Sequence, residues 1–343
     1  MDFLFTPEQD EAAELAARIV GDRATSERMK QVEQAGDRFD RDLWTTLGQA
    51  FDWADLDLVT LARVLVEVGR KVAPVPLATH GACVAFLTGC DESADAGLYA
   101  AAVAEERAHL PVVPTTTATR ADGAWTVTGT KSIVRAGTAA DALLVSAATD
   151  DGTRVFLVDP AAVGVDRQPQ RTSDGDVAAL VTFREAPAEP VGDRDASARL
   201  AQLLVTCAAA EQLGVTEGAL ALTASYAKDR EQFGRPIGTF QAVSQRLADG
   251  FIDVLAQRLT LWQAVWRLSE GLPAETQVAV AKLWAADAGH RLAHTTVHVH
   301  GGVGIDLDGE AHRYFTSAKR FGFLFGGATE QALTIGRGLA RAG

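Results

Sequence analysis

The hydrophobic pattern changes its period twice along the chain, and this change limits the folds that the sequence can adopt. In the first part, apolar residues such as Leu58, Leu61 and Leu65 recur at three- and four-residue intervals, as on one face of a helix. Residues 108–193 instead contain short segments rich in Val, Thr and Phe between Gly, Asp and Pro, which is typical of antiparallel strands. Helical spacing returns after Asp195. The sequence therefore predicts an α+β fold in three parts.

The first predicted domain, residues 1–107, is α-helical and opens on a helix start signal. Thr6 is placed as an N-cap and Pro7 as the first helical residue. Residues 108–193 are expected to form a small antiparallel β domain, and residues 194–343 a C-terminal four-helix bundle. One predicted bundle helix keeps the spacing of a buried face, at Leu247, Phe251, Val254, Leu255, Trp262 and Trp266.

Composition and charge exclude several classes of protein. The chain of 343 residues carries a formal net charge of −13, which argues against nucleic-acid binding because phosphates require a basic surface. The start lacks the basic and apolar regions of a signal peptide, and no run of 18 apolar residues predicts a membrane span. The 3 cysteines form no CxxC pair. These features predict a cytoplasmic protein with no membrane partner.

Histidines are the first residues to test for chemistry. His290, His294 and His298 are four residues apart on a predicted helix, so neighbouring members of the set have the spacing to chelate one ion. The outer two lie roughly 12 Å apart, and no carboxylate is in register with them. We therefore predict no metal site. The sequence also contains no GxSxG motif and no GxGxxG or Walker-type loop after a strand.

Two short segments stand out against this background. The stretch DREQFGRPIGTFQ, residues 229–241, interrupts two long helical runs with two arginines, an aromatic residue and a glutamine that opens the next helix. The stretch GGVG, residues 301–304, follows a helix, where glycines either end the helix or allow a ligand to approach the backbone closely. Alone, GGVG predicts little.

Taken together, these segments resemble the acyl-CoA dehydrogenase family of flavoproteins. The most specific piece is YAKDREQFGRPIGTFQAV, residues 226–243, and the resemblance covers nearly the whole chain. Other matching pieces are LWTTLG (43–48), VEVGRKVAPVPL (66–77), WTVTGTKSIV (125–134) and FLVDPAAVGV (156–165).

The resemblance implies an FAD site built across a dimer interface by the C-terminal domain. Arg230 would bind the pyrophosphate of the neighbouring subunit's flavin, and Phe233 and Gln241 would line the same dinucleotide. Gly301, Gly302 and Gly304 would let the backbone pack against the ADP half. His298 stands where relatives carry the glutamine of a QxxGG motif. The opposing hypothesis for this segment is a plain helix connection with a surface arginine.

The family removes two hydrogens from an acyl-CoA thioester, with a glutamate as the base and flavin as the hydride acceptor. In this chain the usual base position falls on Phe325 or Gly326, and the position used by a second group of relatives falls on Leu204. Neither position holds an acid. Glu211 is a weak candidate because it shares an apolar helix face. The other remaining acids are Glu217, Asp306, Asp308, Glu310 and Glu330.

The absence of an acid at the usual base positions indicates a partner subunit. Residues 110–123 also lack the TEPxxGSD-like loop that holds the isoalloxazine in relatives. Some actinobacterial relatives that act on CoA-linked steroids resemble α2β2 heterotetramers, in which one subunit brings the base and the other completes the flavin site. The leading hypothesis is therefore a non-catalytic subunit that works with a second dehydrogenase-like subunit, FAD, an acyl-CoA and an acceptor such as electron-transfer flavoprotein.

Three alternatives stay open at this point. The chain is a self-sufficient homo-oligomeric dehydrogenase with a relocated base, a flavin-free structural or binding protein on the same fold, or a flavin-dependent monooxygenase. The fold alone does not separate these functions.

Overall fold

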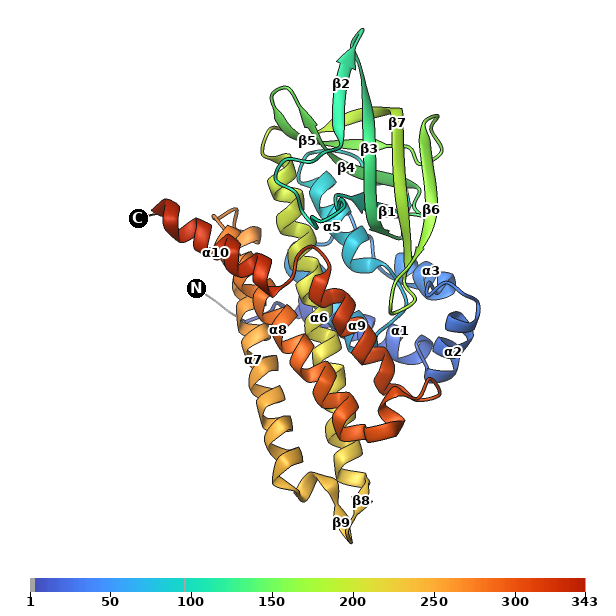
Figure 1. Cartoon of the computed structure of the whole chain (residues 1–343), viewed down its shortest axis with the longest axis vertical. Coiled ribbons are helices and arrows are strands. Elements are labelled where there is room, and N and C mark those ends of the chain that lie inside the picture. Colours follow the sequence, from blue (N-terminus) through green and yellow to red (C-terminus); the bar gives the residue numbers. More distant parts are fainter. Residues whose placement is uncertain (1–3, 96, 343) are drawn as a thin grey trace.

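The computed structural model describes residues 4–95 and 97–342 and has three parts (Figure 1). Helices lead the chain, a sheet follows, and long helices complete it. One apolar core cluster joins the N-terminal helices to the long C-terminal helices, and a second lies within the sheet. None of the described helices contains a segment long and apolar enough to cross a membrane. The predicted α+β fold class is confirmed.

The N-terminal helices begin with the predicted cap. The Thr6 side chain accepts a hydrogen bond from the backbone of Gln9, whose own side chain accepts one from the Thr6 backbone, with Pro7 as the first helical residue. The helices of this part are α1 (Pro7–Arg23), α2 (Ser26–Gln34), α3 (Arg41–Ala50), α4 (Leu58–Arg70) and α5 (Leu77–Thr88).

The sheet contains seven strands, most of them antiparallel. Strand β1 pairs in parallel with β4 and lies before residue 108, so the sheet starts earlier in the chain than the predicted boundary. Its apolar YAAA sequence is short and fully buried, without the alternation that identifies a half-exposed strand. The strands are β1 (Tyr99–Ala102), β2 (Thr117–Ala121), β3 (Ala124–Arg135), β4 (Ala142–Thr149), β5 (Gly152–Val158), β6 (Val165–Arg171) and β7 (Val177–Val191).

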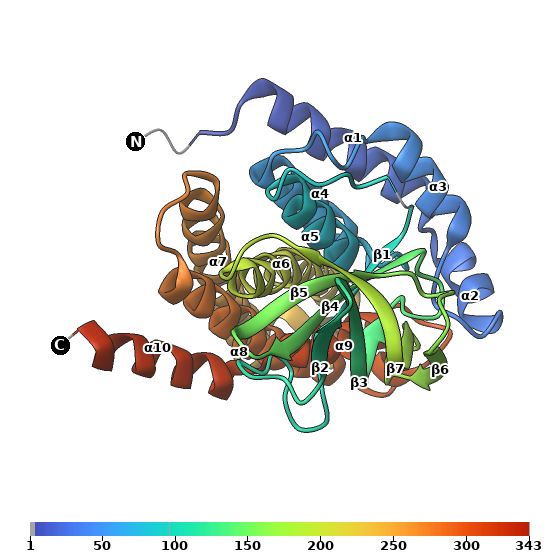
Figure 2. The ribbon, with the colours of Figure 1, turned by 90° about the horizontal axis from the view of Figure 1, so that it is seen from above.

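The C-terminal part is built around α6, which is buried between the N-terminal helices and the other long helices (Figure 2). A small hairpin lies at the end of the bundle away from the sheet, and α10 extends outward from the body (Figure 1). The elements are α6 (Ala196–Asp229), β8 (Glu231–Gln232), β9 (Arg235–Pro236), η1 (Ile237–Thr239), α7 (Gln241–Ser269), α8 (Glu275–His300), η2 (Gly301–Ile305), α9 (Ala311–Phe323) and α10 (Ala328–Ala342).

Glycines allow α4 and α6 to approach at backbone contact. A Cβ atom added to Gly69 would lie 2.0 Å from the Glu211 carbonyl oxygen, and one added to Gly214 would lie 2.0 Å from the Val66 carbonyl oxygen. Both neighbours are backbone atoms of long helices, so neither moves aside easily. This contact holds the N-terminal helices against the bundle.

Helix α7 differs from the buried stripe that its sequence predicts. Val254 is buried, but Phe251 and Leu255 are exposed, and Trp262 and Trp266 are half-buried. The spacing is helical as predicted, yet it includes residues on two faces of the helix. Which of these faces is covered depends on the packing of α7 against α6 and α8, which the spacing does not specify.

We predict that Gly214→Ala lowers the free energy of unfolding by about 1–3 kcal/mol, because the new methyl group must displace the α4 backbone. Gly21→Ala in α1 is the matched control. Its added Cβ meets nothing within 4 Å, so it should raise stability by up to about 1 kcal/mol through helix propensity. Urea denaturation of both variants measures this. Equal stability of the two variants would contradict the packing role of Gly214.

Candidate cofactor-binding site

The hairpin after α6 presents its side chains to solvent. Arg230 is the C-cap residue of α6, just past the helix, and its side chain is exposed. Phe233 adopts a left-handed backbone (φ 54°) and is 93% exposed, although an aromatic residue of this size is usually buried. Gln241 is the exposed first residue of α7. The predicted site residues of this segment therefore lie on one open surface.

The turn after α8 lies beside this hairpin. The Tyr226 and His300 rings stack with centroids 4.3 Å apart, and the Thr223 and Thr296 hydroxyls are 3.0 Å apart. These contacts hold the end of α6 against the end of α8. The structure thus brings together two segments that are some sixty residues apart in the sequence, at the end of the bundle away from the sheet (Figure 1).

The three glycines of the turn have different roles. Gly301 adopts φ 64°, and a Cβ atom added to Gly301 or Gly302 would meet nothing within 4 Å. Their backbones are open to a ligand. Gly304 is buried, and its Cβ would lie 2.9 Å from the Val297 carbonyl oxygen. Gly304 is therefore needed for packing within this chain. His298, on the last turn of α8, is exposed.

Basic side chains without partners gather at this end of the protein. Within the described residues, the side chains of Lys228, Arg230 and Arg246 have no ion pair or hydrogen bond, and Arg235 stacks over Phe240 at 4.3 Å. Asp229 and Glu231 of the same segment are also exposed and have no side-chain ion pair within the described residues. Guanidinium groups beside open glycine backbone have the chemistry to bind phosphates. Lys228 and Arg246 are not among the site residues predicted from the sequence.

A large cavity of about 1490 Å³ lies between the sheet and α9. Ser132 and Ile133 of β3 line one wall, and Lys319 and Phe323 of α9 line the other. Phe325, one of the two residues at which the resemblance places the usual catalytic glutamate, also lines this cavity. The side chain that faces the cavity at that position is thus apolar and carries no group that accepts a proton.

Glu105 is the most enclosed carboxylate in the wall of this cavity. Its oxygens accept hydrogen bonds from the Lys131 Nζ (2.8 Å) and from the backbones of Thr115 (2.7 Å) and Thr116 (2.9 Å). Burial alone would raise the pKa of Glu105, but these donors outweigh it and lower the pKa to about 2. So acidic a carboxyl is a poor base at neutral pH. Glu105 holds the loop around Thr115 and Thr116 in place.

Glu211 is sealed inside the protein. Its carboxylate lies 3.2 Å from Arg135 Nη1, and Arg135 also binds Asp176 at 2.6 Å. All three side chains are buried, and Glu211 does not line the large cavity. Glu211 therefore has an ion-pair partner in the core, and its carboxylate is not exposed to the large cavity.

Most of the remaining acids also have local partners, although the side chain of Glu310 makes no capping hydrogen bond. Glu217 binds Arg70 and Arg258, Asp308 binds Lys30, and Glu330 binds His109. Asp306 caps the Asp308 backbone, and Glu310 is the N-cap residue of α9. Leu204 is fully buried in the core.

The histidines are placed on the outside of α8. His290 and His294 both lie within hydrogen-bond distance of Lys319 Nζ, at 2.7 and 2.8 Å. Among residues 4–95 and 97–342, no three His, Cys, Asp or Glu side chains are grouped so that they could hold a metal ion.

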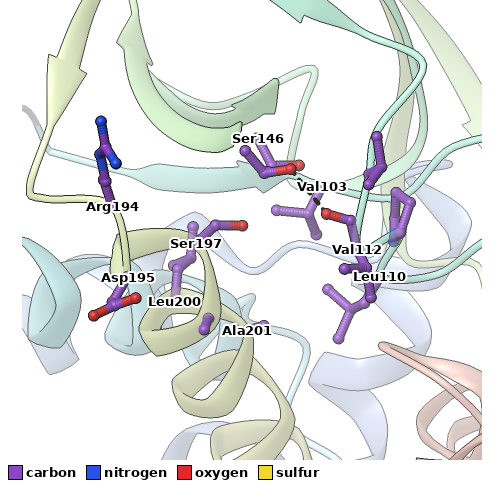
Figure 3. A pocket seen from close by; sticks show the side chains of 13 residues that line it. Val103, Leu110, Val112, Ser146, Arg194, Asp195, Ser197, Leu200 and Ala201 are labelled. Atoms are coloured by element: carbon purple, nitrogen blue, oxygen red, sulfur yellow. Dashed lines mark hydrogen bonds between the residues drawn. The ribbon is translucent and has the colours of Figure 1, made fainter. Parts of the chain in front are cut away.

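A second pocket, of about 420 Å³, lies where the sheet meets the start of α6 (Figure 3). Leu200 and Ala201 of α6 lie across it from Val103 and Leu110. Its walls are mostly apolar, and none of the site residues expected from the sequence lines it.

Lys282 supports the chain segment that carries Phe325. This lysine of α8 is fully buried, and its Nζ donates a hydrogen bond to the Phe321 carbonyl at the end of α9. Burial lowers the pKa of Lys282 to about 7. The sequence gives no signal for this, because a lysine on a helix is ordinarily solvated.

Comparison with known proteins agrees with this geometry. Residues 203–340 match the model of the acyl-CoA dehydrogenase C-terminal domain. The chain is 40% identical to acyl-CoA dehydrogenase FadE27 of Mycobacterium tuberculosis over 99% of both chains. The chain belongs to the acyl-CoA dehydrogenase family, whose members are oxidoreductases that act on CH–CH donors.

Two solved structures are especially similar. The ChsE4–ChsE5 complex of Mycobacterium tuberculosis matches with a TM-score of 0.92 and 38% identity over 99% of both chains. The Tcur3481–Tcur3483 steroid ACAD G363A variant matches with a TM-score of 0.92 and 35% identity over 98% of both chains. Homologues with this fold bind FAD, as in the solved structure of PigA with FAD and proline.

We predict that Lys282 makes stability rise with pH. Between its folded pKa of about 7 and the unfolded lysine value of about 10.4, the unfolded chain binds a proton that the folded protein does not. The free energy of unfolding should therefore increase across this window, by up to about 1.4 kcal/mol per pH unit.

Urea denaturation of wild type, Lys282→Met and Lys71→Met between about pH 7 and about pH 9.5 measures this slope. Lys71 is an exposed lysine at the end of α4 and serves as the control. Lys282→Met should flatten the slope and Lys71→Met should keep it. The same slope in all three proteins would contradict the assignment.

Proposed function

We propose that this chain is the partner subunit of a mixed acyl-CoA dehydrogenase. It completes the FAD site of a second, catalytic subunit, which brings the base for α,β-dehydrogenation of an acyl-CoA thioester. The observation that carries this proposal is a contrast within one molecule. The surface suited to the dinucleotide is intact and open, while the positions of the base hold Phe325, Gly326 and Leu204.

The residues at the end of the bundle fit FAD. Arg230 is unpaired and exposed, so it is free to bind the pyrophosphate with charge-assisted hydrogen bonds. Phe233 offers an apolar face, and Gln241 offers amide groups at the start of α7. Open backbone at Gly301 and Gly302, with His298 one turn earlier, completes the surface. When bound, FAD supplies the hydride acceptor of the reaction.

A second subunit is needed to complete the site. Arg230 and Phe233 are exposed in the hairpin segment at the end of the bundle away from the sheet (Figure 1), and neither lines the cavity between the sheet and α9. We therefore infer that the flavin they would bind belongs to another chain. The similarity to the ChsE4–ChsE5 complex supports a second dehydrogenase-like chain in that place.

The proposal also includes a substrate class, an assembly, an electron acceptor and a location in the cell. The solved Tcur3481–Tcur3483 steroid ACAD supports a steroid thioester as the substrate and an assembly of two different chains. A heterotetramer is the assembly that we propose. Electron-transfer flavoprotein is the proposed electron acceptor. A cytoplasmic location agrees with Cys83, Cys90 and Cys207, which are free thiols.

Flavin content tests the proposal. This chain alone should purify colourless, and after co-expression with its second subunit the complex should hold about one FAD per heterodimer. Arg230→Ala should weaken FAD binding by at least about tenfold, because a charged hydrogen bond contributes about 1.5–3 kcal/mol. Absorbance of bound flavin during dilution or dialysis of the complex measures the loss.

Arg184→Ala is the matched control for Arg230→Ala. Arg184 is an exposed arginine on β7, remote from the hairpin, whose side chain has no partner among the described residues. This variant should keep full FAD content. Full flavin loading of this chain alone, or unchanged FAD affinity in Arg230→Ala, would overturn the proposal.

Glu211→Gln separates the partner subunit from a self-sufficient enzyme. Because Glu211 is buried against Arg135, this variant should keep turnover of the complex within a few-fold. It should lose about 3–5 kcal/mol of stability, because the buried Arg135 would lose one of its two carboxylate partners. Steady-state kinetics and urea denaturation measure the two effects. Abolished turnover with unchanged stability would identify Glu211 as the base.

A further inference from the structure

A lysine and two histidines form a small cluster where α8 and α9 pack together. The Lys319 Nζ lies 2.7 Å from His290 Nδ1 and 2.8 Å from His294 Nε2. The two imidazoles are one helical turn apart on α8, and their ring centroids are 4.7 Å apart. As an ammonium, Lys319 donates a hydrogen bond to each ring, and each ring accepts it with the nitrogen that faces the amine. None of these three residues belongs to the predicted flavin-binding surface.

The partners of Lys319 are unusual because they carry no negative charge. Among the described residues Lys319 forms no ion pair, and its Nζ lies 5.4 Å from the centre of the Phe315 ring. Partial burial lowers the pKa of Lys319. Partial burial and the charge of Lys319 lower the pKa of both histidines. Both rings are therefore neutral at neutral pH, and each keeps a lone pair directed at the amine.

The cluster is accessible from solvent. His290 and His294 are exposed, and Lys319 is half-buried. Both histidines line a pocket of about 370 Å³ between α7 and α8. Arg291, the neighbour of His290 in this pocket, is paired with Asp253 of α7. A dissolved reagent can therefore approach the amine from outside the protein.

We propose that Lys319 is an acyl-acceptor site, at which an acyl-CoA thioester acylates the amine with His290 or His294 as the base. Acyl-CoA thioesters are the compounds that give the family its name, so the acyl donor is present where the protein works. A lysine whose proton has two neutral imidazoles to accept it is a better nucleophile than an ordinary surface lysine.

The step is an acyl transfer without oxidation or reduction. One imidazole takes a proton from the Lys319 ammonium along their hydrogen bond, which frees the lone pair of the nitrogen. The neutral amine attacks the carbonyl carbon of the thioester. The new C–N bond replaces the C–S bond, and the CoA thiolate leaves and takes up a proton. The products are an amide at Lys319 and the free thiol of CoA, and one proton is released to water.

Acylation changes both the cluster and the cavity beside it. The amide is uncharged and has a single N–H, so at most one of the two histidines keeps its hydrogen bond. Lys319 also lines the large cavity between the sheet and α9, so the wall of that cavity loses a positive charge. This inference makes no use of FAD or of the second subunit. It is tested on the full chain alone, and its failure leaves the flavin proposal untouched.

Mass spectrometry of the full chain during incubation with acetyl-CoA tests the proposal. Lys71 and Lys228 are exposed and serve as reference lysines, since neither has a histidine against its amine within the described residues. Acetylation at Lys319 should be at least about tenfold faster than at Lys71 and Lys228, because a positioned base removes the proton. Digestion with a protease that cuts at acidic residues gives the same peptides whether or not the lysines are acetylated.

A double variant, His290→Gln with His294→Gln, separates the role of the base from that of the surroundings. Glutamine still accepts a hydrogen bond from Lys319 but takes up no proton. The acetylation rate at Lys319 should therefore fall by at least about tenfold, while the rate at Lys71 stays the same. Circular dichroism checks that the variant folds.

His109→Gln is the matched control. It makes the same change at a histidine whose ring contacts Glu330 and not Lys319, so Lys319 should keep its wild-type rate. Wild-type acetylation that is no faster at Lys319 than at the reference lysines would overturn the proposal. So would an unchanged rate at Lys319 in the double variant.

Discussion

A buried network of charges joins the three parts of this protein. Arg135 of β3 binds Glu211 of α6 and Asp176 of the loop before β7, Arg320 of α9 binds Asp176 and Asp174, and Arg38 binds Asp174. The three arginines and three acids balance. Each is hydrogen-bonded as well as paired, which buried charges require. Removing one member would leave an uncompensated charge and cost about 3–5 kcal/mol, so the sheet, α6 and α9 keep one relative position.

The consequence for function is a division between two regions. Near the network, Glu211 and the two aspartates are held by fixed arginines, and the cavity wall carries Phe325. At the far end of the bundle, Arg230 has no partner and Phe233 lies in solvent. Exposed groups of this kind have a physical reason when another chain or a ligand covers them. An apolar cavity wall at one end and exposed, unpaired side chains at the other are what we expect of the proposed partner subunit.

Much of the site was predictable because it depends on residue identity. Arg230, Phe233 and Gln241 are read from one segment, and the absence of an acid at Phe325 and Gly326 needs no coordinates. The proximity of Tyr226 to His300 was less accessible, since it joins the ends of two helices that are separated by the whole of α7 and α8. The stretches YAKDREQFG and HGGVG gave the only signal for it.

The sequence by itself determined the order of helices and strands and the family, and it predicted the loss of the usual base. These properties follow from local spacing and from the chemistry of single positions. Only the tertiary structure decided that Glu211 pairs with Arg135, that Gly304 serves packing, and that the side chains of Phe251 and Leu255 are exposed. Each of these depends on which elements meet in space, and helical spacing places a residue on a face without saying what covers that face.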